Sequence, residues 1–228
     1  MDVVEAVLSR KSIRAFKPDP VPGKVLEEIL EAAVRAPSWA NTQPWELAVV
    51  GGEKLLELKL ALAAVVDEAP RPDIPRIPDF PEPYGSRRRI LGRKVMELKG
   101  IAREDQEKRR WWHLQMVTFF DAPGVVLLCG DSSFYRMKDF FNGWALFSCG
   151  SLAMNITLLA ANRGLGTCCE VAPVGYPDVI RRVLDISDSK LMVLAIAVGY
   201  PDWEEPVNQI RSDREALETI TTWYGFPE

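Results

Sequence analysis

Residues 191–199 (LMVLAIAVG) decide the fold of this 228-residue chain. All nine are apolar or glycine, and an unbroken apolar run of this length is typical of a central strand in a sheet covered on both faces. A membrane span needs roughly 18–20 apolar residues, and no uninterrupted run in the chain is that long. The run therefore predicts a buried strand, with helices on both faces of its sheet.

The rest of the chain supplies the other elements of such a sheet. Residues 46–50 (ELAVV) and 124–130 (GVVLLCG) are predicted strands, and residues 167–171 are a further short candidate. Helices are predicted at residues 2–9, 22–36, 53–67, 86–119 (as one helix or two), 139–162, 176–184 and 214–221. Because strands and helices interleave, we expect a mixed α/β chain in which helices flank one sheet.

The predicted helix at residues 139–162 differs from the others because it is apolar on nearly every side. Small residues such as Gly143, Ala145 and Gly150 are interspersed along it. A helix that is hydrophobic all round is typically buried, and small side chains let neighbouring backbones approach. We therefore expect this helix to lie in the core.

A change in composition interrupts the pattern after the third predicted helix. Residues 70–83 (PRPDIPRIPDFPEP) contain six prolines, which no regular element tolerates. Residues 71–110 carry twelve Lys and Arg against seven Asp and Glu. We expect a single domain over residues 1–228 with a Pro/Arg-rich excursion at about 68–110, in preference to two domains.

Composition narrows the class of function. The formal net charge of −4 and a pI of about 5.3 argue against a nucleic-acid partner. Four cysteines without metal-site spacing and an acidic N-terminal segment predict a reduced, cytoplasmic protein without a signal peptide. The single histidine, His113, excludes a multi-histidine metal site, and there is no GxSxG motif or phosphate loop. If the protein is an enzyme, a bound organic cofactor would carry the chemistry.

Arg10, Ser12 and Arg14 form the first candidate binding set. In an extended segment alternate residues face the same way, so two guanidinium groups and a hydroxyl would point to one side. Such groups match the oxygens of a phosphate through charge-assisted hydrogen bonds. The alternative interpretation is a solvated edge strand with ordinary surface charge.

Arg211 and Arg214 form the second candidate set. They are three residues apart, so a helical turn would bring them to one face. The alternative is the start of a helix capped by Ser212 or Asp213.

Two further segments combine polar groups with special backbone residues. Residues 37–45 (PSWANTQPW) offer amide and hydroxyl groups for the edge of a flat heterocycle, or form a plain helix-to-strand turn. Residues 164–172 (GLGTCCEVA) place glycines before a strand, where they allow close backbone approach. Their vicinal cysteines are interpreted as small apolar residues rather than redox groups. Residues 87–89 (RRR) are interpreted as a solvated helix face, with a nearby dinucleotide phosphate as the alternative.

Taken in order, four segments resemble the motifs of the FMN-dependent nitroreductase family. They are residues 10–16 (RKSIRAF), 36–50 (APSWANTQPWELAVV), 164–172 (GLGTCCEVA) and 197–220 (AVGYPDWEEPVNQIRSDREALETI). Residues 77–105 are similar to the branch that contains nitrobenzoate and dinitroaniline reductases. Two departures concern substrate choice: the closing motif reads REALE where the family has RRPLE, and Trp39 replaces a small residue.

The resemblance implies an α+β fold with a mixed, mainly antiparallel sheet flanked by helices. It also implies an intertwined homodimer with one FMN per subunit at the interface, close to the 139–162 helix. The implied activity passes a hydride from NADH or NADPH through flavin N5 to a nitroaromatic, quinone or similar flat acceptor, with ping-pong kinetics.

The resemblance further implies roles for individual residues, none of which is an acid or base because flavin N5 carries the chemistry. The FMN phosphate and ribityl chain would be held by Arg10, Lys11, Ser12, Arg14, Arg211 and Arg214. The isoalloxazine would be bordered by Pro37, Ser38 and Asn41, with Asn41 reaching the flavin of the other subunit, and Gln115 would touch the pyrimidine edge. Backbone around Cys169, Glu170 and Val171 would approach N5.

Other functions use the same features. Within the fold, the alternatives are an ene-reductase, a reductive dehalogenase or a flavin-fragmenting enzyme, because the same cofactor residues serve all of them. A non-catalytic flavin-binding sensor would use the excursion to block the pocket or to dock a partner. A protein without flavin would use the excursion as a basic peptide- or nucleotide-binding arm.

Overall fold

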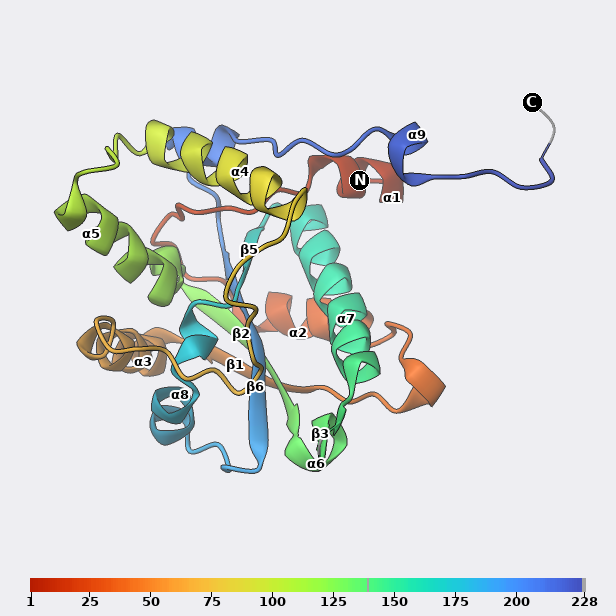
Figure 1. The fold of residues 1–228 in the computed structure, drawn as a ribbon. Coiled ribbons are helices and arrows are strands. Elements are labelled where there is room, and N and C mark those ends of the chain that lie inside the picture. Colours follow the sequence, from red (N-terminus) through yellow and green to blue (C-terminus); the bar gives the residue numbers. More distant parts are fainter. Residues whose placement is uncertain (139, 227–228) are drawn as a thin grey trace.

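One four-stranded sheet organises the computed structural model, which describes residues 1–138 and 140–226. Its strands are β1 (Glu46–Gly51), β2 (Gly124–Asp131), β5 (Gly166–Glu170) and β6 (Lys190–Gly199), in the order β1–β2–β6–β5. Each neighbouring pair is antiparallel. The apolar run that the sequence marks as a central strand is β6, which pairs on both sides (Figure 1).

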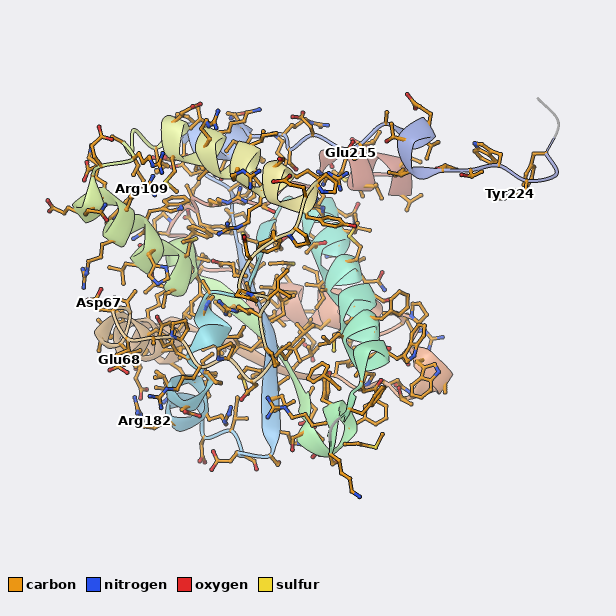
Figure 2. The ribbon with its side chains drawn as sticks, in the orientation of Figure 1. Asp67, Glu68, Arg109, Arg182, Glu215 and Tyr224 are labelled. Atoms are coloured by element: carbon orange, nitrogen blue, oxygen red, sulfur yellow. The ribbon has the colours of Figure 1, made fainter. Side chains whose placement is uncertain are left out.

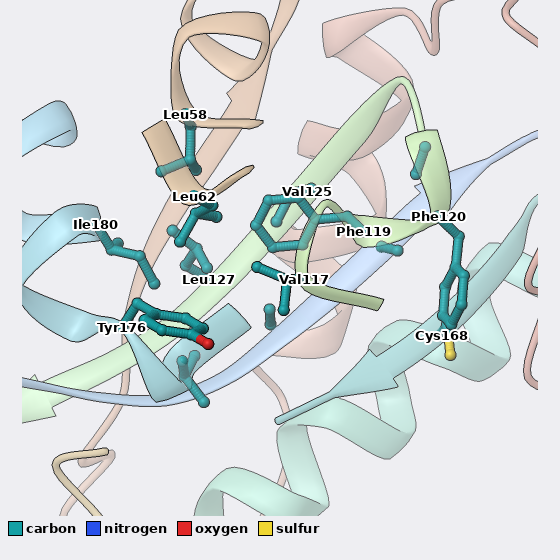
Figure 3. Packing of buried hydrophobic residues seen from close by; sticks show 14 of the residues in the cluster. Leu58, Leu62, Val117, Phe119, Phe120, Val125, Leu127, Cys168, Tyr176 and Ile180 are labelled. Carbon is teal, nitrogen blue, oxygen red and sulfur yellow. The ribbon is translucent and has the colours of Figure 1, made fainter. Parts of the chain in front are cut away.

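Helices cover both faces of this sheet, as the apolar strand predicts. The first face carries α3 (Gly52–Ala64), α5 (Gln106–Val117) and α8 (Pro177–Leu184), and the second carries α2 (Gly23–Ala33) and α7 (Gly143–Asn162). Figure 3 shows the first core, in which side chains of α3 and α8 meet those of β2. The two cores lie on opposite faces of β2 and β6.

Alternation along β2 assigns its side chains to the two cores. Val125 and Leu127 belong to the first core, whereas Val126 and Leu128 belong to the second. All four are buried. Successive side chains in a strand point to opposite faces, so a strand with a core on each side has to be apolar throughout.

The segment at residues 10–16 lies against the outer edge of β5. Ile13 N donates to Thr167 O at 2.9 Å, and Ser12 and Thr167 form a parallel bridge. Ile13 is buried, which turns Ser12 and Arg14 away from the core. This parallel contact makes the otherwise antiparallel sheet mixed.

Helix α7 is shorter and less buried than its sequence predicts. It begins at Gly143, after Phe140–Phe141 (β4) has paired with Arg136–Met137 (β3), and residue 139 lies outside the described residues. The helix is long and apolar enough to cross a membrane, but it packs on the sheet as a core helix does. Its second side is exposed: Trp144 and Phe147 have 56% and 65% of their surface accessible.

The predicted helix at residues 86–119 is two helices, α4 (Tyr84–Leu98) and α5. Gly100, with a φ of 62°, separates them, and Asp105 caps α5. The helix predicted at residues 214–221 is reduced to α9 (Leu217–Ile220). The other elements are α1 (Val3–Ser9), α6 (Ser132–Tyr135) and the 3₁₀ turns η1 (Trp39–Asn41), η2 (Phe119–Asp121), η3 (Pro173–Gly175) and η4 (Pro206–Gln209).

Residues 68–83, which we call the strap, have no regular structure but are bound to the body. Asp73 accepts two hydrogen bonds from Arg181 of α8, both at 2.9 Å, and one from Met192 N at 2.8 Å. The two charged side chains are only 9% and 11% exposed. Arg71 N also donates to Gly175 O at 2.8 Å. These contacts carry the strap across α8 and η3 to the start of α4.

We predict that Asp73→Ala destabilises the fold by about 3 kcal/mol or more, because it leaves the buried Arg181 without its main partner. The free energy of unfolding, measured by urea denaturation, checks this expectation. Asp67→Ala is the matched control, since Asp67 pairs with Arg110 at the exposed outer end of α3 (Figure 2) and should change stability little. Equal stabilities of the two variants would contradict the anchoring role of Asp73.

Candidate functional site

A cavity of about 410 Å³ lies where residues 7–14 meet residues 210–214. Leu91 of α4 and Met154 of α7 complete its wall. We call it the arginine cavity. The predicted binding residues that line it are Arg10, Lys11, Ser12, Arg14, Arg211 and Arg214. The structure therefore brings together two charged segments that are about two hundred residues apart in the chain.

A buried asparagine fixes the N-terminal half of this cavity. Asn208 Oδ1 accepts from Arg14 N at 2.7 Å, and Asn208 Nδ2 donates to Ala15 O and Asp202 O, each at 2.7 Å. These bonds attach the extended segment to the turn that precedes Arg211. Sequence reasoning did not single out Asn208, and its only local signal is a polar residue between the apolar Val207 and Ile210.

The C-terminal half of the cavity has no helical turn. Residues 210–216 have no regular structure, and α9 is preceded by Ala216. The predicted helical turn of Arg211 and Arg214 and the alternative cap at Ser212 or Asp213 are therefore both wrong. The Arg214 guanidinium instead donates to Ser212 O at 3.1 Å and Ser212 Oγ at 2.8 Å. Arg211 and Arg214 still line one cavity, because the chain passes along its rim.

The charged side chains that line the cavity are all cationic, and burial affects the ionisation of a nearby acid, Glu170. Glu170, at the end of β5, is buried, and its Oε1 has no hydrogen-bond partner within the described residues. Burial raises the pKa of Glu170 well above its ordinary value, although the charge of Arg14 opposes this shift. A raised pKa favours the neutral carboxyl, which does not offset the arginines.

The turn after β5 lies within reach of the strap. Arg76 of the strap donates a hydrogen bond to Val171 O, and the Val171 side chain is exposed. Cys169 is exposed, whereas Cys168 is buried in the first core, and that burial raises the pKa of its thiol. A thiol with a raised pKa is a poor nucleophile, which agrees with a packing role for Cys168.

The loop of Pro37, Ser38 and Asn41 lies elsewhere in the subunit. Trp39 N donates to Ser148 Oγ at 3.2 Å, which fastens the loop to the N-terminal half of α7. Ser38 Oγ accepts from Gln43 N at 3.0 Å. Figure 1 shows this loop and α1, beside the cavity, at opposite ends of α7. Within one subunit the loop is not brought to the arginine cavity.

Gln115 is also separate from the cavity. It lies half-buried on α5 and is not among the residues that line the arginine cavity. Among the predicted binding residues, one subunit therefore assembles those assigned to the phosphate and ribityl chain.

The donor set of the cavity fits a phosphate-bearing group. Guanidinium groups present planar, charged donors that match phosphate oxygens, and four arginines line this cavity together with the Ser12 hydroxyl. Its volume lies within the roughly 300–1,000 Å³ of small-molecule sites. The donor set of the cavity therefore suits an anionic group.

The chain is similar to known proteins over nearly its whole length. The nitroreductase family matches residues 7–200. Nitrobenzene nitroreductase of Ectopseudomonas oleovorans is 33% identical over 224 residues, which cover 96% of this chain and 95% of that protein. The 4-nitrobenzoate reductase of Pseudomonas putida is 30% identical over 226 residues, which cover 99% and 96%.

A solved structure extends the similarity to the fold. The crystal structure of the FMN and NADPH-dependent nitroreductase NfnB from Sphigopyxis sp. strain HMH has a TM-score of 0.91 at 30% identity and covers 99% of this chain and 100% of that one. This similarity confirms the expected α+β fold. Because the family match contains the whole sheet and the N-terminal arginine segment, the chain belongs to the nitroreductase family.

Proposed function

We propose that the protein is an FMN-dependent oxidoreductase that uses NADH or NADPH to reduce a nitroaromatic, quinone or similar flat acceptor. The observation that carries the proposal is the convergence of residues 10–14 and 211–214 on one cavity in a nitroreductase-family chain. FMN, when bound, supplies the hydride chemistry. Nitroaromatic acceptors are favoured because the relatives are named for nitrobenzene and 4-nitrobenzoate.

Within this proposal the arginine cavity binds the FMN phosphate. Arg10, Arg14 and Arg214 supply charged donors, with Arg211 on the rim, and Ser12 supplies a hydroxyl. Lys11 is held near the site because its ammonium lies 5.3 Å from the centre of the Trp203 ring. Glu170, with its raised pKa, leaves the positive potential largely intact. Backbone around Cys169, Glu170 and Val171 would face the reactive edge of the flavin.

We further infer that two copies of the chain form a homodimer and that each site is shared between them. Large apolar side chains are exposed on α1, on α7, on α9 and on the segment after α9: Val3, Val4, Val7, Leu8, Trp144, Phe147, Ile220, Trp223 and Phe226. The segment after α9 extends away from the body (Figure 1). A monomer rarely exposes this much apolar surface.

A two-fold partner would also complete the binding site. The loop of Pro37, Ser38 and Asn41 lies at the far end of α7 from its own cavity. In a symmetric dimer formed along α7, the loop of one copy is brought toward the cavity of the other. Asn41 would then reach the flavin of the partner subunit. The predicted contact of Gln115 with the flavin would come from α5, apart from the arginine cavity.

The remaining inferences concern the whole chain. We infer that residues 1–228 act as one FMN-binding domain, whose excursion at about 68–110 supplies the strap and α4 beside the site. We also place the protein in the cytoplasm, in agreement with four unpaired cysteines. Donor and acceptor would occupy the same pocket in turn, which gives ping-pong kinetics.

We predict that Arg10→Ala combined with Arg14→Ala lowers FMN affinity by about 100-fold or more, since each charge-assisted hydrogen bond contributes roughly 1.5–3 kcal/mol. Quenching of FMN fluorescence, titrated with flavin-free protein, measures the affinity. Lys17→Ala is the control, because Lys17 is exposed in the same segment and does not line the cavity. If the double variant binds FMN within threefold of the parent, the phosphate assignment is wrong.

We predict that Phe147→Glu on the exposed side of α7 yields a monomer that also binds FMN more weakly, because a buried charge opposes dimerisation. Sedimentation velocity measures the oligomeric state, and absorbance at the flavin band measures occupancy. Leu56→Glu is the control, since Leu56 is 57% exposed on α3, on the other side of the sheet. A Phe147→Glu protein that stays dimeric with full flavin would disprove the shared site.

A further inference from the structure

A second cavity, of about 600 Å³, lies between α4 and the chain that leaves the arginine cavity. We call it the α4 cavity. It shares Leu91, Arg211, Ser212 and Arg214 with the arginine cavity, so the two cavities adjoin. Figure 2 shows Glu215, one of its lining residues, next to the N-terminal end of α4.

One face of α4 supplies half of this cavity. Arg87, Leu91 and Lys94 are spaced four and three residues apart, which places them on the same side of a helix. Arg88, which also lines the cavity, lies with its guanidinium 5.2 Å from the centre of the Phe80 ring in the strap. Residues 87–89 are exposed, as expected for a solvated helix face, and two of them, Arg87 and Arg88, also line this cavity.

The α4 cavity carries excess positive charge. Five cationic side chains line it, against the two carboxylates of Asp213 and Glu215. Glu215 is already paired with Arg87 at 2.7 Å. No carboxylate of residues 1–138 or 140–226 lies within ion-pair distance of Arg88, Lys94 or Arg211. Like charges that converge on a concave surface favour an anionic ligand.

This charge exceeds what one flavin phosphate requires. The arginine cavity offers Arg10, Lys11 and Arg14 to that group, and none of the three lines the α4 cavity. Arg88 and Lys94 line only the α4 cavity. A second phosphate group, on a different ligand, is the anion that these two residues would bind.

Three apolar residues stand among the charged groups of this wall. Ile90, Leu91 and Ile220 line the α4 cavity together with the cations. Apolar side chains beside charged donors suit a flat organic ring with an anionic substituent. An adenosine that carries a phosphate has this chemistry.

We propose that the α4 cavity binds the adenosine 2′-phosphate of NADPH, and that Arg88 and Lys94 make the enzyme prefer NADPH over NADH. The two coenzymes differ only by this phosphate, which is largely a dianion at neutral pH. The inference rests on the proposed function, because the nicotinamide end has to reach the flavin. To the proposed function it adds the binding site for the 2′-phosphate and the residues that discriminate between NADPH and NADH as hydride donors.

The test compares two nucleotide probes on the FMN-loaded protein. Adenosine 2′,5′-bisphosphate carries the 2′-phosphate, and 5′-AMP lacks it. Isothermal titration calorimetry should show at least tenfold tighter binding of the bisphosphate to the parent. Arg88→Ala combined with Lys94→Ala should weaken bisphosphate binding by about 10- to 100-fold, as the loss of one or two charge-assisted hydrogen bonds predicts. The affinity for 5′-AMP should change much less.

Steady-state kinetics gives the second measurement. In the double variant, the ratio of kcat/KM for NADPH to kcat/KM for NADH should fall by about the same factor as bisphosphate affinity. Arg93→Ala is the matched control, because Arg93 is an exposed cation on α4 that does not line the cavity. It should keep the ratio of the parent.

The result that overturns the inference is an unchanged NADPH/NADH ratio and unchanged bisphosphate affinity in the double variant. Full FMN absorbance in that protein separates this failure from a failure of the proposed function, which would remove the flavin itself. A parent that binds FAD more tightly than FMN, and loses this preference in the double variant, would also overturn it. The cavity would then bind the adenylate of the flavin.

Discussion

Strand β6 is apolar on both faces, and the rest of the architecture follows from covering it. One face is covered by α3, α5 and α8, and the other by α2 and α7. At the edge of the sheet, the segment at residues 10–16 pairs with β5, buries Ile13 and thereby directs Ser12 and Arg14 outward. Helix α7 keeps a second apolar side exposed after it has covered β6, and a second copy of the chain is the surface that we infer for it.

The site concentrates positive charge around one edge of the sheet. Residues 10–14, α4 and residues 211–214 all contribute cations, which outnumber the nearby carboxylates of Asp213 and Glu215. Burial raises the pKa of a third nearby acid, Glu170. The Arg214 guanidinium donates to the carbonyl and hydroxyl oxygens of Ser212. Both groups are neutral, so these hydrogen bonds do not cancel its positive charge. Phosphate groups of a flavin and a nucleotide would offset it, which links the binding of two ligands to one electrostatic feature.

Apolar runs and prolines in the sequence predicted the central strands and the irregular strap. The apolar runs predicted β2 and β6, the helix predicted at residues 22–36 contains α2, and the prolines correctly predicted an irregular strap. Long-range contacts left no such signal: neither the Asp73–Arg181 pair nor the bonds of Asn208 could be read from spacing. The spacing of Arg211 and Arg214 predicted a helical turn, but the segment is irregular and Arg214 bonds to Ser212 within it. The flavin contact that we infer for the loop at Asn41 depends on a second copy of the chain, which local patterns do not reveal.

The most direct test of the central claim is an anaerobic titration of the purified protein, followed by its visible spectrum. We predict that one equivalent of NADPH per flavin bleaches the oxidised FMN spectrum and that a nitroaromatic acceptor, added after the NADP⁺ has been removed, restores it. Repeated cycles should give the same amplitudes. A protein that contains no flavin and takes up no added FMN, or a bound flavin that NADPH and NADH both fail to reduce, would contradict the account.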